Sequence, residues 1–122
     1  MSYNETLAAR VRKTIAGQKE LEEKRMFGGL TFMVNGNMCC GVLNDDLVVR
    51  IGLDRYRKAL ARPHARPMDF TGRPLKGMLY IGPEGCKTDQ ALKSWVDQAV
   101  SFALLLPTGG SEKRALRKSR KR

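Results

Sequence analysis

Apolar residues recur every four positions near the start of the chain, at Leu7, Val11 and Ile15. This spacing places them on one side of an α-helix, while the basic residues between them face water. We therefore predict an amphipathic helix over residues 4–16, ended by Gly17.

The apolar pattern then changes to a period of two, which is typical of β-strands. A short strand is predicted over residues 24–27 and a β-hairpin over residues 30–43. The hairpin is centred on Asn35-Gly36, a dipeptide that tolerates the positive φ angles of a type I′ turn. A second two-residue loop at 44–45 leads into a further strand.

Two-residue loops fix which residues of neighbouring strands lie opposite each other. Here they place Phe32 opposite Cys39, and Val42 opposite Leu47. We expect one face of the sheet to be the core face, formed by Thr31, Met33, Met38, Cys40, Val42, Leu47, Val49 and Ile51. The other face is mixed and consists of Leu30, Phe32, Val34, Asn37, Cys39, Gly41, Leu43, Val48 and Arg50. Because the mixed face is too apolar to be left bare, it needs a covering helix, a binding partner or both.

The second half of the chain is predicted to hold two more helices and further strands. A helix capped by Asp54 stops before Pro63. Residues 66–77 contain two prolines and two glycines and are expected to form a shaped loop with a short strand around residues 68–70. A strand over residues 78–81 follows.

The last predicted helix is capped by Thr88 and runs to about Leu106. Leu104 and Leu105 lie off its inner stripe and are expected to be exposed. The whole order is a helix, three or four antiparallel strands, a helix, two strands and a helix. Such segregation of helices and strands is typical of a small α+β domain.

The 122 residues carry a net charge of +11, and this excess is unevenly distributed. Residues 111–122 hold seven basic residues and one acidic residue, which is more than half of the net charge. We expect residues 1–107 to form one α+β domain and residues 108–122 to be a disordered basic tail. The chain is too short for a kinase or for a barrel enzyme of about 250 residues.

The three cysteines are odd in number, and two of them are adjacent. They therefore do not form the paired framework of a small secreted domain, and no metal-ligand spacing accompanies them. No signal-peptide core is present, and the longest apolar run, residues 102–106, is far shorter than the ~20 residues of a bilayer span. We expect a cytoplasmic protein with no membrane segment, metal or cofactor.

Three stretches resemble a known family: KRMFGGLTFMVNGNMCCGV at 24–42, VRIG at 49–52 and RPMDFTGRPLKG at 66–77. Together they are similar to the TfoX N-terminal domain family, over roughly residues 3–106. The resemblance implies an α+β fold related to that of type III secretion chaperones, with no known catalytic residues. In the full-length bacterial TfoX (Sxy) regulators, which activate competence genes, this domain precedes a helical C-terminal domain. This chain carries a basic tail in that place.

These features favour a non-enzymatic regulatory or adaptor domain that binds a protein partner, linked to transcriptional or competence-type regulation and acting as a homodimer. The candidate surface for a partner or a second copy consists of apolar residues expected to lack a cover: Phe32, Val34, Leu43, Val48, Leu104 and Leu105.

A candidate anion-binding loop lies within residues 66–77. Arg66, Arg73 and Lys76 supply positive charge there, and the two glycines can expose backbone N–H groups. The alternative is a self-hydrogen-bonded turn in which Arg73 pairs with Asp69 or a neighbouring carboxylate.

The tail carries the alternative function, nucleic-acid binding. Its cations could meet phosphates without sequence specificity, although no aromatic residue is interleaved for base stacking. The residues concerned are Lys113, Arg114, Arg117, Lys118, Arg120, Lys121 and Arg122. A tail that only keeps the protein soluble is the competing interpretation.

Cys39 is a candidate reactive thiol because the predicted register places it beside Arg50, and a nearby cation lowers the pKa of a thiol. The competing interpretation is a half-covered, inert strand residue. His64 is the only histidine, so catalytic triads and zinc-ligand sets are nearly excluded.

Overall fold

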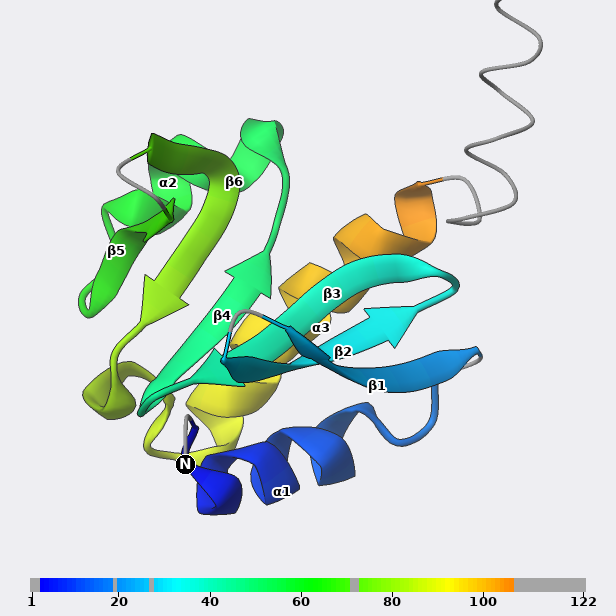
Figure 1. Ribbon diagram of the computed structural model, residues 1–122. Helices are drawn as coiled ribbons and strands as arrows, with labels where there is room; N and C mark the ends of the chain where they lie inside the picture. The colour runs from blue at the N-terminus through cyan, green and yellow to red at the C-terminus, as the bar shows by residue number, and fades with distance from the viewer. Residues whose placement is uncertain (1–2, 19, 27, 71–72, 107–122) are drawn as a thin grey trace, which may run out of the picture.

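The computed structural model describes residues 3–18, 20–26, 28–70 and 73–106. Three α-helices and a six-stranded sheet follow one another in the predicted order, so the α+β fold class is confirmed (Figure 1). The elements are α1 (Glu5–Ile15), β1 (Leu21–Met26), β2 (Gly29–Val34), β3 (Asn37–Leu43), β4 (Asp46–Arg50), α2 (Leu53–Leu60), β5 (Ala65–Phe70), β6 (Arg73–Ile81), the 3₁₀ turn η1 (Pro83–Cys86) and α3 (Asp89–Leu105).

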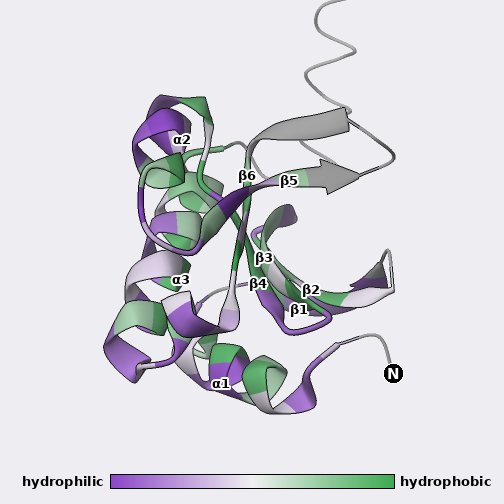
Figure 2. Ribbon diagram, turned by 90° about the vertical axis from the view of Figure 1, so that its left-hand side faces the viewer, coloured by the Kyte–Doolittle hydropathy of each residue, from purple (hydrophilic) through white to green (hydrophobic). Residues whose placement is uncertain are grey.

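The sheet is antiparallel throughout, with the strand order β1-β2-β3-β4-β6-β5. All three helices pack on one side of it: α3 runs behind β3 and β4 in Figure 1, and α1, α2 and α3 stand together to the left of the sheet in Figure 2. Within the described ranges, no helix covers the opposite side, which we call the open face.

The helices begin where capping side chains or special backbone angles allow. The Asn4 side chain accepts a hydrogen bond from the Leu7 N–H (3.0 Å), and the Thr88 hydroxyl accepts one from the Ala91 N–H (3.1 Å). The predicted cap of the second helix was wrong, because Asp54 lies in its first turn. Gly52 precedes α2 instead, with φ of +86°.

Both predicted two-residue turns are present. Asn35 and Gly36 have φ of 55° and 78°, as a type I′ turn requires, and the pair Val34–Asn37 closes the hairpin. The β3–β4 register also holds, with Val42 opposite Leu47. The β2–β3 register fails in one place: Phe32 lies opposite Cys40, because Cys39 is an extra residue on β3. This is a β-bulge, in which one strand has two residues where its partner has one.

The bulge changes which residues face the helices. A one-residue shift turns every side chain on one side of it to the other face. Phe32 and Val34 therefore join Cys40 and Val42 in the core. The predicted division of the sheet into a core face and a mixed face is wrong across β2 and at the start of β3, where Met38 lies on the open face and Asn37 is buried. The core between sheet and helices is built mainly from large, fully buried side chains: Trp95, Phe32, Ile15, Leu47, Ile51, Leu79, Ile81, Leu92, Val11, Val34, Val42 and Val49.

The short strand predicted around residues 68–70 is part of β5, but the rest of the predicted loop was wrong: residues 66–70 and 73–77 belong to the hairpin strands β5 and β6, and residues 71–72 lie outside the described residues. Prolines predict a loop because they cannot donate to a strand ladder. Here Pro67 lies on the edge strand β5. Pro74 lies on the first part of β6, before Met78, and this part of the strand does not pair with β4. Neither position interrupts the shared β4–β6 ladder.

Candidate protein-interaction surface on the open face of the sheet

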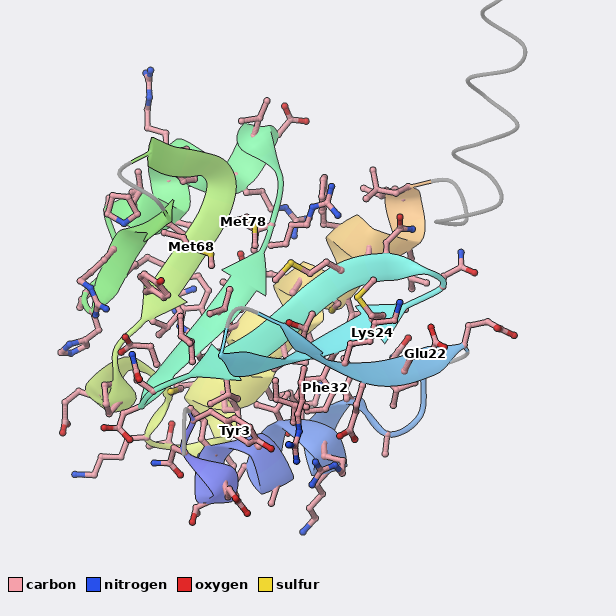
Figure 3. All side chains as sticks on the ribbon, viewed as in Figure 1. Tyr3, Glu22, Lys24, Phe32, Met68 and Met78 are labelled. Atoms are coloured by element: carbon pink, nitrogen blue, oxygen red, sulfur yellow. The ribbon has the colours of Figure 1, made fainter. Side chains whose placement is uncertain are left out.

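The open face is assembled by strand alternation from all six strands. One row of cross-strand neighbours runs from Lys24 through Thr31, Gly41, Val48 and Tyr80 to Arg66. Methionine side chains flank this row: Met33 and Met38 lie opposite each other on β2 and β3, and Met68 and Met78 come from β5 and β6 (Figure 3). The face therefore carries four of the six methionines of the chain.

The sheet curves, with its β5–β6 end above and its β1–β2 end below in Figure 2. The open face holds a hollow, which we call the trough; it is lined by Gly29, Leu30, Thr31, Met38, Gly41, Val42, Leu43, Val48 and Met68. Thr31, Val48 and Met68 are at most 5% exposed although no described helix covers them. The glycine at position 41 permits this close packing, because a Cβ there would lie 2.6 Å from the Leu30 carbonyl oxygen. The base of the trough is thus narrow, apolar and well ordered by its own strands.

The two sides of the trough are polar. Glu22 and Lys24 project from β1 at one side (Figure 3). At the other side the Arg66 guanidinium pairs with Asp46 (2.8 Å) and lies over the Tyr80 ring, 5.3 Å from its centroid. An apolar base with a polar rim is the usual anatomy of a protein-protein interface.

The sheet edges are poorly suited to pairing with another strand. β1 is an edge strand with the sequence LEEKRM, and β5 is an edge strand that contains Pro67. Charged residues and proline on edge strands oppose edge-to-edge association. Contact with another protein is therefore better supported through the face than through an edge.

The six residues predicted to form one interaction surface lie in three different environments. Phe32 and Val34 are fully buried under the helices, so their placement at the surface was wrong. Leu43 and Val48 belong to the open face. Leu104 and Leu105 are exposed, as predicted, but they lie at the end of α3 on the helix side. The methionines of the open face were not predicted as part of this surface. The signal that could have indicated them was the presence of four methionines within predicted strands.

The predicted anion-binding loop is not assembled among the described side chains. Arg66 is already paired with Asp46 and stacked on Tyr80. The backbone of Arg73 and Lys76 belongs to β6, and their side chains lie outside the described part of the structure. The Gly77 carbonyl accepts hydrogen bonds from the N–H groups of Ile51 (2.9 Å) and Gly52. It ties β6 to the start of α2.

The cysteines are enclosed. Cys39, Cys40 and Cys86 are all free and buried. A hydrogen bond with Cys39, together with burial, holds the pKa of the Cys40 thiol well above its ordinary value. The Arg50 guanidinium, which the predicted register placed beside Cys39, lies over the Phe102 ring, 5.4 Å from its centroid. The hydrogen bond and the burial both disfavour a Cys40 thiolate at neutral pH.

Thiol labelling tests this arrangement. With Ellman's reagent at neutral pH, we expect the native protein to react at least about a hundredfold more slowly than the urea-unfolded protein, because buried thiols become accessible only when the structure opens. The unfolded protein should titrate three thiols. A thiol that reacts in the native protein as fast as a free peptide thiol, and that Cys39→Ser removes, would restore the reactive-thiol hypothesis.

Other kinds of site are not found in the part of the chain that the structure describes. In those residues no group of three or more His, Cys, Asp or Glu side chains could hold a metal ion. Over the same residues, no helix is both long and apolar enough to cross a bilayer. The tail cations, from Lys113 to Arg122, lie outside the described residues.

Comparison with known proteins agrees with the resemblance of the sequence. The family model of the TfoX N-terminal domain matches residues 13–103, which contain all six strands, α2 and most of α3. Searches of curated proteins and of solved structures gave no significant match, so the likeness to secretion chaperones stays a prediction. Because the match spans most of the chain and its α+β domain, this protein belongs to the TfoX N-terminal domain family.

Proposed function

We propose that this protein is a non-enzymatic, cytoplasmic regulatory domain of the competence-regulator type that acts by binding proteins, and that the open face of its sheet binds a second copy of the chain. The observation that carries the proposal is the methionine-flanked trough, which has no cover among the described elements. Methionine side chains are flexible and polarisable, so such surfaces adapt to protein partners.

A second copy suits this face because its rim is self-complementary. In a two-fold dimer each patch meets the same patch of the other copy. Glu22 and Lys24 project side by side from β1, so a two-fold axis near β2 can bring the carboxylate of one copy to the ammonium of the other. Burial of the methionines would contribute about 25 cal/mol for each Å² of apolar surface removed from water.

Analytical ultracentrifugation of the full chain tests the dimer. We expect the wild type to sediment as a dimer at micromolar concentration, and Met38→Glu to weaken the dimer at least about tenfold, because a carboxylate would be buried in the apolar contact. Gln90→Glu, an exposed change at the start of α3, is the matched control and should leave the dimer intact.

A second variant, Met33→Lys, introduces the opposite charge at another position of the same face. If both variants weaken the dimer, the loss does not depend on a folding defect peculiar to one substitution. Both variants should keep the wild-type circular dichroism spectrum. A wild type that stays monomeric at high micromolar concentration would refute the second copy as the occupant. A dimer that survives both variants would refute the open face as its site.

The alternative function, nucleic-acid binding through the basic tail, remains a separate prediction. It depends on residues 108–122, and nothing among the described residues adds to it.

A further inference from the structure

A groove on the helix side of the molecule belongs to none of the surfaces discussed so far. Its apolar half, about 410 Å³, lies between the start of α2 and the end of α3 and is lined by Ile51, Gly52, Leu53, Asp54, Arg55, Phe102 and Leu105. Its basic half, about 440 Å³, is lined by Arg55, Lys58, Ala59, Arg62 and Gln98. Arg55 lines both halves, so we treat them as one feature, the α2–α3 groove.

The apolar half is unusually exposed for so small a domain. Leu53 and Leu105, on its opposite walls, are 67% and 79% exposed. Phe102 also lines this half, and the Arg50 guanidinium lies over its ring, 5.4 Å from the centroid. Large apolar side chains that remain in water around a formed hollow are typical of a binding site for an apolar group.

The basic half displays three cations. Arg55 and Lys58 lie three residues apart on α2, Arg62 follows shortly after the helix ends, and all three line the hollow. None of the ion pairs among the described residues includes them. Arg62 lies over the Trp95 ring, 4.1 Å from its centroid, which fixes the plane of its guanidinium. A stacked guanidinium keeps its N–H edge available for a carboxylate.

We propose that the α2–α3 groove binds an acidic amphipathic helix of a partner protein. An apolar side chain of that helix would enter between Leu53 and Leu105, and carboxylates on its flank would pair with the three cations. An amphipathic helix laid in a groove is a common mode of peptide recognition. The inference rests on the proposed role as a protein-binding domain, and it names a partner other than the second copy, at a separate site.

Charge and apolar surface together favour this occupant over two others. The basic tail of the same chain, net +6 over residues 111–122, would be repelled by Arg55, Lys58 and Arg62. A nucleic acid could use the cations, but it would leave Leu53 and Leu105 without an apolar partner. The Phe102 ring, already stacked with Arg50, offers little face for a base. An acidic amphipathic helix uses both halves of the groove.

Fluorescence anisotropy on the full chain tests the proposal with a designed probe. The probe is a labelled helical peptide with leucines on one face and glutamates beside them, compared with the same peptide carrying glutamine for glutamate. We expect the glutamate peptide to bind at least about tenfold more tightly, and its binding to weaken as salt is raised. Failure of the wild type to bind the glutamate peptide, or equal binding of both peptides, would overturn the proposal.

Matched variants locate the site. Arg55→Glu and Lys58→Glu should each weaken peptide binding at least about tenfold, whereas Arg57→Glu, an exposed cation of α2 outside the groove, should change it less than about threefold. Leu105→Ser should weaken binding similarly, whereas its exposed neighbour Leu104→Ser should not. Equal effects of Arg55→Glu and Arg57→Glu would refute the groove and indicate unspecific charge attraction.

Two further measurements separate the alternatives. Single-stranded DNA that displaces the peptide, and whose binding is abolished by Arg55→Glu, would assign the groove to nucleic acid and refute an acidic helix. Sedimentation of Arg55→Glu should give the same dimer as the wild type, because the open face lies on the other side of the sheet. If Met38→Glu loses the dimer but still binds the glutamate peptide, the open face and the α2–α3 groove are separate sites, and either proposal can fail without the other.

Discussion

Replacing Phe32 by alanine should lower the free energy of unfolding by about 3–5 kcal/mol, a large part of the 5–15 kcal/mol typical of a whole domain. The side chain is fully buried among the core residues between the sheet and the helices. Its removal deletes apolar contacts and leaves a cavity that close-packed neighbours fill only in part. Urea unfolding followed by circular dichroism measures the loss as a fall in the transition midpoint.

The next residue supplies the control. Met33 lies on the open face and is only partly buried, so Met33→Ala should cost about 1 kcal/mol or less. The ratio of the two losses of unfolding free energy reports which of the two side chains faces the helices. Equal losses, or a larger loss for Met33→Ala, would mean that the β2–β3 hairpin lacks the bulge and follows the regular register.

The bulge explains why the sequence pattern assigned β2 to the wrong face. Its extra residue, Cys39, stands next to Cys40, and both are small and buried. On β2 the neighbours Phe32 and Met33 are both large and apolar. Either register therefore places one large apolar side chain in the core and the other on the open face, and polarity does not distinguish the two. Alternation predicts faces only when the residues of the two faces differ in polarity.

Signals that act within a few residues were more reliable by comparison, although the cap predicted at Asp54 was wrong. Periodicity predicted α1, Asn35-Gly36 predicted the hairpin turn, and Thr88 predicted the start of α3. The hairpin turn and the helix cap each depend on interactions within a few neighbouring residues. The two strands of the β5–β6 hairpin were predicted too short, because the position of a proline in the finished sheet decides whether it is tolerated.

The α2–α3 groove could not have been derived from local pattern. Its cations come from residues 55–62 and its apolar walls from both Leu53 and the end of α3, more than forty positions later. The exposure of Leu105 was predicted because it lies off the apolar stripe of the last helix. Which residues lie opposite it depends on how α2 packs against α3. Sequence reasoning thus found one wall of the groove without its other parts.

Replacing Gly52 by alanine should cost about 2–4 kcal/mol and should also distort the groove. The residue has φ of +86°, which side chains of L-residues rarely adopt, and the strain alone is worth about 1–3 kcal/mol. A Cβ would lie 2.4 Å from Cε1 of Phe102, so this ring, which lines the groove, would have to move. The backbone cannot rotate away freely, because the N–H groups of Ile51 and Gly52 both donate to the Gly77 carbonyl.

Gly17→Ala is the control for this last change, since a Cβ there would meet nothing within 4 Å. It should leave stability unchanged or raise it slightly, because alanine restricts the unfolded chain. Urea midpoints compare the two variants, and anisotropy with the glutamate peptide shows whether Gly52→Ala also loses binding. A Gly52→Ala protein as stable as Gly17→Ala would mean that Phe102 does not pack against this turn. Gly52 therefore couples the stability of the domain to the shape of the site where we propose that a partner binds.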